Sequence, residues 1–328
     1  MKEILPKNKT EKKNSSFSKK RTYKVIIDID QAGRRVDNYL RGELPSVPKS
    51  RIYRMLRKGE VRINGGRIKP EYKLAKGDEV RIPPVSVSVK NIKPPHYLYS
   101  KILNYIVYED KNLLVLNKPS GLAVHGGSGI SFGVIELLRY ARPDLKELGL
   151  VHRLDRETSG CLVISKRKNI LRKIHESFRL GKVEKNYLAL VVGNWKLGDQ
   201  LIDLPLHVNN RKHGERHVIV NSKLGKIAQT EISFLKKYGN YSLLRCIPIT
   251  GRTHQIRVHL AHLEFPILAD HRYGDFEENH IARKELGIDR IFLHSQSIGF
   301  SNNEGNDLHF SAPMPEDLEK FLLSIDKK

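Results

Sequence analysis

The chain has 328 residues, enough for about two domains, and 39% of them are hydrophobic, which argues against a disordered chain. It has neither a long apolar run nor a secretory pattern, so a membrane-spanning protein is not expected. The 59 Lys and Arg residues exceed the 36 Asp and Glu residues by 23 charges. This excess favours a polyanionic partner such as nucleic acid, although an anionic membrane surface would attract the same charge.

Two cysteines, Cys161 and Cys246, stand far apart and form no CxxC spacing. Such usage is typical of a reduced, cytoplasmic protein in which both thiols pack in the core. We therefore expect neither a disulfide nor a cysteine metal site.

Residues 1–22 are rich in Lys, Ser and Asn and hold almost nothing that could be buried. They predict a flexible basic tail. The tail could add electrostatic affinity for nucleic acid, or it could be a disordered terminus without a function, and the sequence leaves both open.

A compact module is expected over residues 23–92. YKVIIDI alternates like a strand, and RRVDNYLRGEL and PKSRIYRMLRKG predict two short helices, the second with Ser50 as N-cap and Gly59 as its end. EVRIN and GRIKPEYKL, joined by the turn Asn64-Gly65, predict a hairpin, and GDEVRIP predicts a last strand.

The second of these helices is basic over most of its surface. Its apolar residues fall on one face, and the rest carries Lys49, Arg51, Arg54, Arg57 and Lys58. A merely solvated helix usually carries mixed charges, so this face favours RNA or DNA phosphates.

The order of RRVDNYL, KSRIYRMLRKGEVRIN and KPEYKLAKGDEVRI resembles the S4-type RNA-binding domain over about 60 residues. The resemblance implies RNA binding by the basic helix, with Lys49, Ser50, Arg51 and Arg54 as contacts.

Residues 85–101 contain paired prolines at 94 and 95 and predict a linker, with a domain boundary near residue 93. Residues 93–328 then predict one larger domain. Its predicted strands include GCLVISKR, KNYLALVVGNW, KIAQTEISFLKKYGNYSLLRCIPI and DRIFLHSQSIGF, and its predicted helices GVIELLRYARPDL and KNILRKIHESFRLGK. Because several strands follow one another without a helix between them, we expect an α+β fold with a mainly antiparallel mixed sheet.

Two motifs point only weakly to ligands. The stretch HGGSGISFG, residues 125–133, lacks the Gly-Lys-Ser/Thr ending of a phosphate loop, so we expect a flexible loop and no nucleotide cofactor. His259 and His262 are spaced so that a helix could present both, but no acidic residue or Cys accompanies them and HExxH is missing. We therefore expect packing or RNA-contact histidines and no metal.

The block VHRLDRETSG sets one carboxylate, Asp155, between Arg153 and Arg156. Positive neighbours favour the ionised carboxylate, and an ionised Asp can attack an electrophilic carbon. A structural Asp–Arg pair beside a turn, or part of a grip on phosphate, explains the same residues. Glu157 as a partner for two-carboxylate glycosidase chemistry is disfavoured, because the sequence does not establish facing geometry.

Three motifs favour the catalytic interpretation of Asp155 over the structural one. HRLDRETSG, KNYLALVVG and GRTHQIRVHLAHLEFPILAD followed by YG occur in this order. They resemble the three motifs of the RluA family of pseudouridine synthases, and the S4-type module ahead of them resembles the branch of that family that acts on large-subunit ribosomal RNA.

The resemblance implies conversion of uridine to pseudouridine without metal, nucleotide or organic cofactor. It implies that Asp155 is the catalytic carboxylate, that Tyr187 stacks on the target base or takes part in proton transfer, and that Arg257 pairs with Asp155 and orients it. It further implies that Arg153 fills the gap left by the extruded nucleotide.

The same resemblance places Arg252 and His254 against the RNA. It implies 23S ribosomal RNA as the partner, no membrane, a cytoplasmic location and a monomer. A non-catalytic RNA-binding or ribosome-assembly factor is the alternative, although a pure binder has no use for a carboxylate that faces phosphates.

Overall fold

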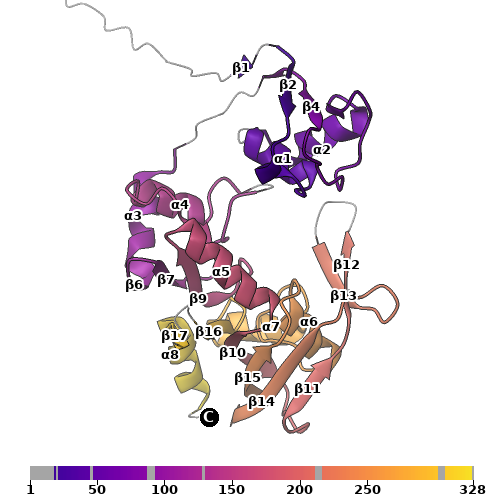
Figure 1. Ribbon diagram of the computed structural model, residues 1–328. Helices are drawn as coiled ribbons and strands as arrows, with labels where there is room; N and C mark the ends of the chain where they lie inside the picture. Colours follow the sequence, from indigo (N-terminus) through magenta and orange to yellow (C-terminus); the bar gives the residue numbers. More distant parts are fainter. Residues whose placement is uncertain are drawn as a thin grey trace, which may run out of the picture. The chain divides into compact units, whose positions relative to one another are not determined.

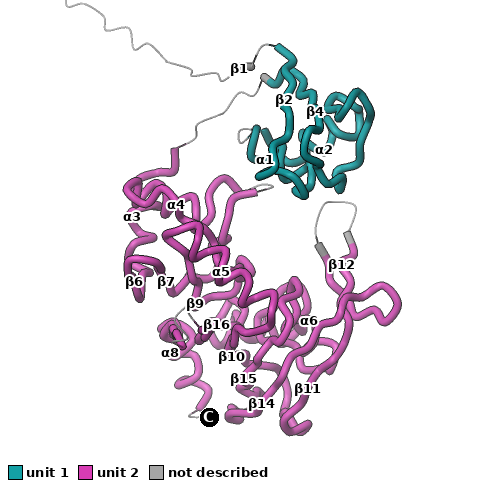
Figure 2. The backbone as a smooth tube through the Cα atoms, viewed as in Figure 1, with its two compact units in different colours: residues 1–92 teal, residues 93–328 magenta. Residues whose placement is uncertain are grey.

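The computed structural model describes residues 18–19, 21–44, 47–86, 93–127, 130–210, 216–301 and 307–326. The chain divides into two compact units, residues 1–92 and residues 93–328 (Figure 2). Nearly all of the predicted basic tail, residues 1–22, lies outside the described residues.

The first unit packs two helices against a small antiparallel sheet. The helices are α1 (Val36–Glu43) and α2 (Lys49–Lys58). The sheet has the order β2-β4-β3, with β2 at Tyr23–Ile26, β4 at Glu79–Ile82 and β3 at Arg62–Ile63, and a short pair, β1 (Ser18–Lys19) with β5 (Val85–Ser86), lies outside it. A 3-10 turn, Ile29–Gln31, precedes α1. The apolar faces of these elements form one core.

Two local expectations for this unit are wrong. The strand that pairs with β3 is β4, not GRIKPEYKL, because the Asn64-Gly65 turn closes at once onto Gly66 and the chain then leaves the sheet. The N-cap of α2 is Pro48 and not Ser50, since the helix begins at Lys49. Gly59 ends α2 as expected, at a φ of 68° that favours glycine.

The segment predicted as a linker, residues 85–101, is in part regular structure. It begins with β5, and after Pro95 it forms helix α3 (His96–Lys101), because proline suits the position just before a helix. A 3-10 turn, Ile102–Tyr105, follows directly.

The second unit is built on one long mixed sheet of order β11-β14-β15-β10-β16-β9-β7-β6, to which β8 and β17 add at β9 and β16 (Figure 1). Every pairing in this sheet is antiparallel except that of β16 with β9. The expected α+β fold with a mainly antiparallel sheet is confirmed. Its strands are β6 (Ile106–Glu109), β7 (Leu113–Lys118), β8 (Gly149–Leu150), β9 (Ser159–Ser165), β10 (Val183–Val192), β11 (Gln200–Asp203), β14 (Gln229–Tyr238), β15 (Tyr241–Pro248), β16 (Leu293–Ser301) and β17 (Asp307–Ser311).

Helices flank this sheet, and a separate hairpin extends from it (Figure 1). The hairpin pairs β12 (Leu206–Asn210) with β13 (Arg216–Val220). The helices are α4 (Val134–Ala141), α5 (Lys168–Arg179), α6 (Gln255–His262), α7 (Phe276–Glu285) and α8 (Glu316–Ile325). Helix α4 ends two residues before Pro143, as the conformational restriction before proline requires.

Three of the sheet's connections matter for the site. The loop from β8 to β9 carries VHRLDRETSG, β10 runs through the middle of the sheet between β15 and β16, and the loop from β15 into α6 carries TGRTH. Gly160 at the start of β9 has a φ of 114°, and a Cβ there would lie 2.2 Å from the carbonyl oxygen of Ser295. Only glycine therefore lets β9 begin against β16, directly after the Asp155 loop.

Candidate active site

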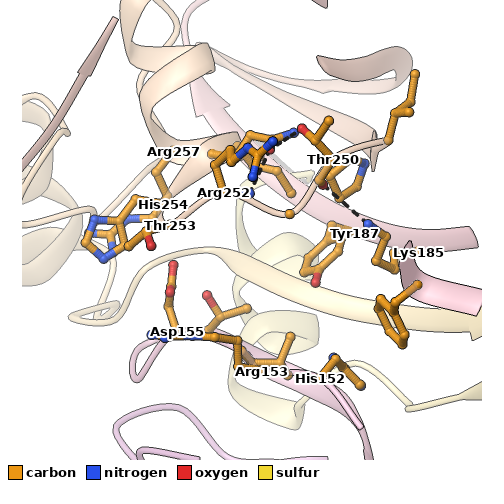
Figure 3. A pocket seen from close by; sticks show the side chains of 18 of the residues that line it. His152, Arg153, Asp155, Lys185, Tyr187, Thr250, Arg252, Thr253, His254 and Arg257 are labelled. Atoms are coloured by element: carbon orange, nitrogen blue, oxygen red, sulfur yellow. Dashed lines mark hydrogen bonds between the residues drawn. The ribbon is translucent and has the colours of Figure 1, made fainter. Parts of the chain in front are cut away.

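A cavity of about 790 Å³ opens in the second unit, within the usual size range of ligand sites. Its walls come from the β8–β9 loop, the end of α5, strand β10 and the segment 248–257 (Figure 3). Asp155, Tyr187, Arg257, Arg153, Arg252 and His254 all line it. The fold thus brings together the predicted site residues of all three motifs, which lie up to about 100 positions apart.

The Asp155 loop is held mainly through its backbone. The Nζ of Lys118, a fully buried side chain, donates hydrogen bonds to the carbonyl oxygens of Pro119, Leu122 and Arg156 at 2.8–3.0 Å. Ser120 donates to the carbonyl of Glu157 at 2.6 Å. Burial lowers the pKa of Lys118 to about 7, while its carbonyl partners favour the charged amine. Asp155 is therefore carried by a fixed loop.

The expected basic clasp around Asp155 is not formed as the sequence predicted. The guanidinium of Arg156 turns to the carbonyl of Gly121 at 3.0 Å and to the carboxylate of Glu157 at 3.5 Å. Arg153 is exposed and lines the cavity. Neighbours in sequence point to different sides of a tight loop, so only one of the two arginines shares the cavity with Asp155.

Tyr187 lies on β10, in the middle of the sheet, and its ring lines the cavity (Figure 3). Burial raises the pKa of its hydroxyl well above the usual value; a hydrogen bond with Ser295 acts in the opposite direction, and the charge of Asp155 adds to the rise. The side chain is consequently a neutral phenol at neutral pH, able to stack or to donate a proton, and it lies close enough to Asp155 to respond to its charge.

Arg257 is buried on α6 and pairs with Asp270, not with Asp155. Its Nε and Nη2 donate to the two carboxylate oxygens of Asp270 at 2.7 and 2.6 Å. Asp270 is itself buried and also accepts backbone N–H groups of Arg272 and Tyr273. The predicted direct pair between Arg257 and Asp155 is wrong for this structure, because the buried carboxylate of Asp270 takes two guanidinium donors. Asp155 still contributes to the raised pKa of Arg257.

His254 occupies a strained position at the start of α6. It has a φ of 54°, a left-handed conformation that a histidine rarely adopts, and its Nδ1 lies 2.8 Å from the hydroxyl of Tyr273. That hydroxyl also accepts the backbone N–H of Val218 on β13 at 3.0 Å. Burial lowers the pKa of His254 to about 4, so the ring is neutral at neutral pH. Tyr273 thus connects the β12–β13 hairpin to a wall of the cavity.

Arg252 lies on the same segment, at the exposed side of the cavity. Its Nε donates to the carbonyl of Ile227 at 2.9 Å, and its backbone N–H donates to the side chain of Gln255 at 3.0 Å. These bonds fix the segment but leave the terminal guanidinium nitrogens without a recorded protein partner among the described residues. Arg252 is placed where a bound polyanion could reach it.

Sequence reasoning assigned no role to three further basic side chains of the cavity, of which Arg179 lies at the end of α5. Lys185 lies two residues before Tyr187 on β10, and His152 lies in the Asp155 loop. His152 accepts the backbone N–H of Val163 at 3.1 Å, and burial lowers its pKa to about 3, so it serves the loop as a neutral acceptor. The signal for Lys185 was available in the sequence, since residues i and i+2 of a strand share one face.

The predicted RNA contacts of the first unit lie on α2, where Lys49, Ser50 and Arg54 are exposed. Arg51 is different, because its guanidinium forms a two-bond ion pair with Glu60 at 2.9 and 2.6 Å. Lys49 and Arg54 therefore offer freer cations than Arg51 does.

The described residues contain no cluster of three or more potential metal ligands. His259 contacts Thr230 and the carbonyl of Leu204 with its two ring nitrogens, as a packing histidine does. Both cysteines are buried and unpaired. None of the helices within the described ranges combines the length and apolar character needed to cross a bilayer.

Comparison with known proteins identifies the family of the chain. The RNA pseudouridylate synthase family model matches residues 112–262, and the S4 domain model matches residues 34–80. Two solved human structures are similar in fold. One, RNA pseudouridylate synthase domain containing 4, has a TM-score of 0.59 and 27% identity, covering 70% of this chain and 96% of the other. The other, domain containing 1, has a TM-score of 0.55 and 25% identity, covering 68% and 87%.

Curated relatives extend the similarity over nearly the whole chain. The ribosomal large subunit pseudouridine synthase C of Escherichia coli K12 is 48% identical over 306 residues, 92% of this chain and 96% of that protein. Its counterpart in Haemophilus influenzae is 48% identical over 320 residues, 96% of this chain and 98% of that protein. An identity this high over almost the full length of both chains shows common descent. The chain belongs to the RNA pseudouridylate synthase family and is an isomerase that carries an S4 domain.

Proposed function

We propose that this enzyme converts specific uridines of large-subunit, 23S, ribosomal RNA to pseudouridine. The observation that carries the proposal is the convergence of Asp155, Tyr187 and Arg257 on one cavity from three separate elements. The substrate class is supported by the relatives that share 48% identity over most of both chains and are named for the ribosomal large subunit.

In the proposed reaction, the bond between uracil N1 and ribose C1′ breaks, the base turns, and a bond forms between uracil C5 and the same C1′. The proton on C5 passes to water, and N1 gains a proton. Asp155 supplies an ionised carboxylate to the reacting nucleotide. Attack on the sugar carbon, attack on the base and a glycal route all start from that carboxylate, so the proposal does not depend on the route.

The other cavity residues are proposed to hold an extruded uridine. The ring of Tyr187 stacks on the base, and its protonated hydroxyl is available as a donor. Arg153, exposed at the cavity, fills the gap in the RNA, which offsets part of an extrusion cost of roughly a few kcal/mol. Arg257, fixed by Asp270, supplies positive potential near Asp155, and Arg252 and His254 contact the RNA.

The competing function is a non-catalytic RNA-binding or ribosome-assembly factor. Asp155 disfavours it, because a carboxylate in a cationic cavity repels the phosphates that a pure binder must attract. We also propose that the enzyme acts as a monomer in the cytoplasm, where ribosomal RNA is found, and that the reaction needs no cofactor, since an isomerisation involves no net redox change.

The test measures tritium release from a 23S ribosomal RNA transcript that carries 5-tritiated uridine. Asp155→Asn should lower the rate by roughly 10³-fold or more. Glu157→Gln is the matched control, because this neighbouring carboxylate pairs with Arg156 and does not line the cavity; its rate should stay within about twofold. Turnover by the Asn variant, or no release by the wild type, refutes the proposal.

A further inference from the structure

Lys185 is a half-buried cation with little compensation inside the active-site cavity. It lies on β10 beside Tyr187, and its Nζ donates one hydrogen bond, to the carbonyl of Thr250 at a long 3.3 Å (Figure 3). Burial alone lowers the pKa of this amine to about 8, with no neighbouring anion acting against it. An ammonium group in such a place loses water without gaining a counter-ion.

The chain contains a structural lysine for comparison. Lys118 is more deeply buried, yet each of its N–H groups has a carbonyl partner at 2.8–3.0 Å. Lys185 has one such partner among the described residues, at a longer distance. If Lys185 only supported the Thr250 segment, its N–H groups would be expected to have short hydrogen bonds to the protein, as those of Lys118 have.

The charges of the cavity indicate which kind of ligand the remaining N–H groups of Lys185 would bind. Among the described residues that line it, Asp155 is the sole carboxylate, whereas the cations are Arg153, Arg179, Lys185, Arg252 and Arg257. Arg257 is paired with Asp270, which lies outside the lining. The other cations leave the cavity strongly positive, so a ligand with full negative charges fits it better than a neutral base does.

We propose that Lys185 binds a phosphate oxygen of the RNA from within the cavity, at a phosphate that flanks the target uridine. This inference rests on the proposed function for the identity of the RNA. A carbonyl oxygen of the uracil would be a weaker fit, because it would leave the charge of a partly desolvated ammonium group uncompensated. With the base on Tyr187 and the ribose facing Asp155, Lys185 is then a binding residue and not a member of the reacting set.

The test compares Lys185→Met, Lys185→Arg and Lys185→Gln in the full-length protein, with tritium release from the 23S transcript as the assay. The Met variant keeps an unbranched side chain of nearly the same length, without the terminal ammonium group and its charge. It should raise KM about tenfold, change kcat much less, and make the dependence of log kcat/KM on log salt shallower by about one unit. The Arg variant should have the KM and the salt dependence of the wild type, and the Gln variant should have neither.

Lys237→Met is the control, because it removes one exposed lysine of β14 that does not line the cavity. It should leave KM and the salt slope unchanged. The inference is overturned if Lys185→Met behaves like this control. Rescue by Gln as good as by Arg would also overturn it, since it would identify an uncharged acceptor. The inference is also overturned if Lys185→Met lowers the melting temperature and Lys185→Arg does not restore activity, because Lys185 would then be a structural support.

Failure of the proposed function can be distinguished from failure of the phosphate contact by a binding experiment. Filter binding of the same transcript to Asp155→Asn and to the Asp155→Asn/Lys185→Met double variant measures the salt slope without turnover. A wild type that releases no tritium would refute the proposed function, while a slope difference of about one unit between these two proteins would still support the phosphate contact. Equal slopes would refute that contact.

Discussion

The pair of Arg257 and Asp270 carries the electrostatics of the site at the scale of single residues. Both side chains are buried, and the two are joined by two short hydrogen bonds. The sequence drew attention to Arg257 but not to Asp270, since one carboxylate among 36 acidic residues carries no signal of its partner. Only the fold shows that these two side chains lie within hydrogen-bonding distance of each other.

Asp270→Asn is expected to destabilise the protein by about 3 kcal/mol at pH 7, because it leaves the buried guanidinium of Arg257 without its counter-ion. Burial acts to raise the pKa of Asp270, but Arg257 and the backbone N–H donors outweigh it and hold the pKa below its usual range. Urea unfolding of the two proteins measures the difference.

The sign of the pH dependence follows from this lowered pKa. The unfolded carboxyl binds its proton near pH 3.9, and the folded one only at lower pH, so the contribution of Asp270 is complete above that value and is lost as the pH falls below it. The stability difference between wild type and Asp270→Asn should therefore shrink from pH 7 to pH 3. An equal difference at both pH values would contradict this account.

At the scale of elements, the spacing of apolar residues predicted the helices and strands well. Which strands pair with one another depended on contacts between segments that are separated in the sequence. β3 pairs with β4 across a loop of fifteen residues, and nothing in EVRIN or GDEVRIP specified that choice. The ion pair of Arg51 with Glu60 joins residues only nine positions apart, yet the charge pattern of the helix did not indicate it.

Helix α2 provides a test at this scale. Arg54 is exposed and has no ion pair among those recorded for the described residues, so it is free to meet phosphate. Arg54→Ala should weaken binding to the 23S transcript and lower the salt slope by about one unit, whereas Arg54→Lys, which keeps the charge, should lose much less. Filter binding at several salt concentrations measures both effects. Identical slopes for Ala and wild type would show that α2 does not contact the backbone of the RNA.

For the whole molecule, the two units bury separate cores. The apolar cluster of the first unit draws on residues 23–85, and the clusters of the second draw only on residues from Leu98 onward. The cavity, too, is lined entirely by residues of the second unit. Residues 93–328 are consequently expected to fold and to keep the chemistry without the rest.

A protein of residues 93–328 should therefore release tritium from the transcript at a measurable kcat, with a raised KM and a shallower salt dependence than the full chain. Filter binding and the tritium assay on the two proteins measure these quantities. Circular dichroism confirms that the shorter protein is folded. Binding that is as tight and as salt-dependent as that of the full chain would contradict a role for the S4 unit in RNA affinity.

The sequence by itself determined the class of fold and the two-part organisation, and it singled out Asp155 as the candidate reacting carboxylate, because periodicity, charge and short motifs are local properties of the sequence. Only the tertiary structure decided which charges meet. Arg156 pairs with Glu157 and not with Asp155, Arg257 is held by Asp270, and Lys185, which lines the cavity, donates to the carbonyl of Thr250. The physical reason is that burial and pairing depend on segments that the fold brings together, 13 positions apart for Arg257 and Asp270 and 65 for Lys185 and Thr250, which no local pattern encodes.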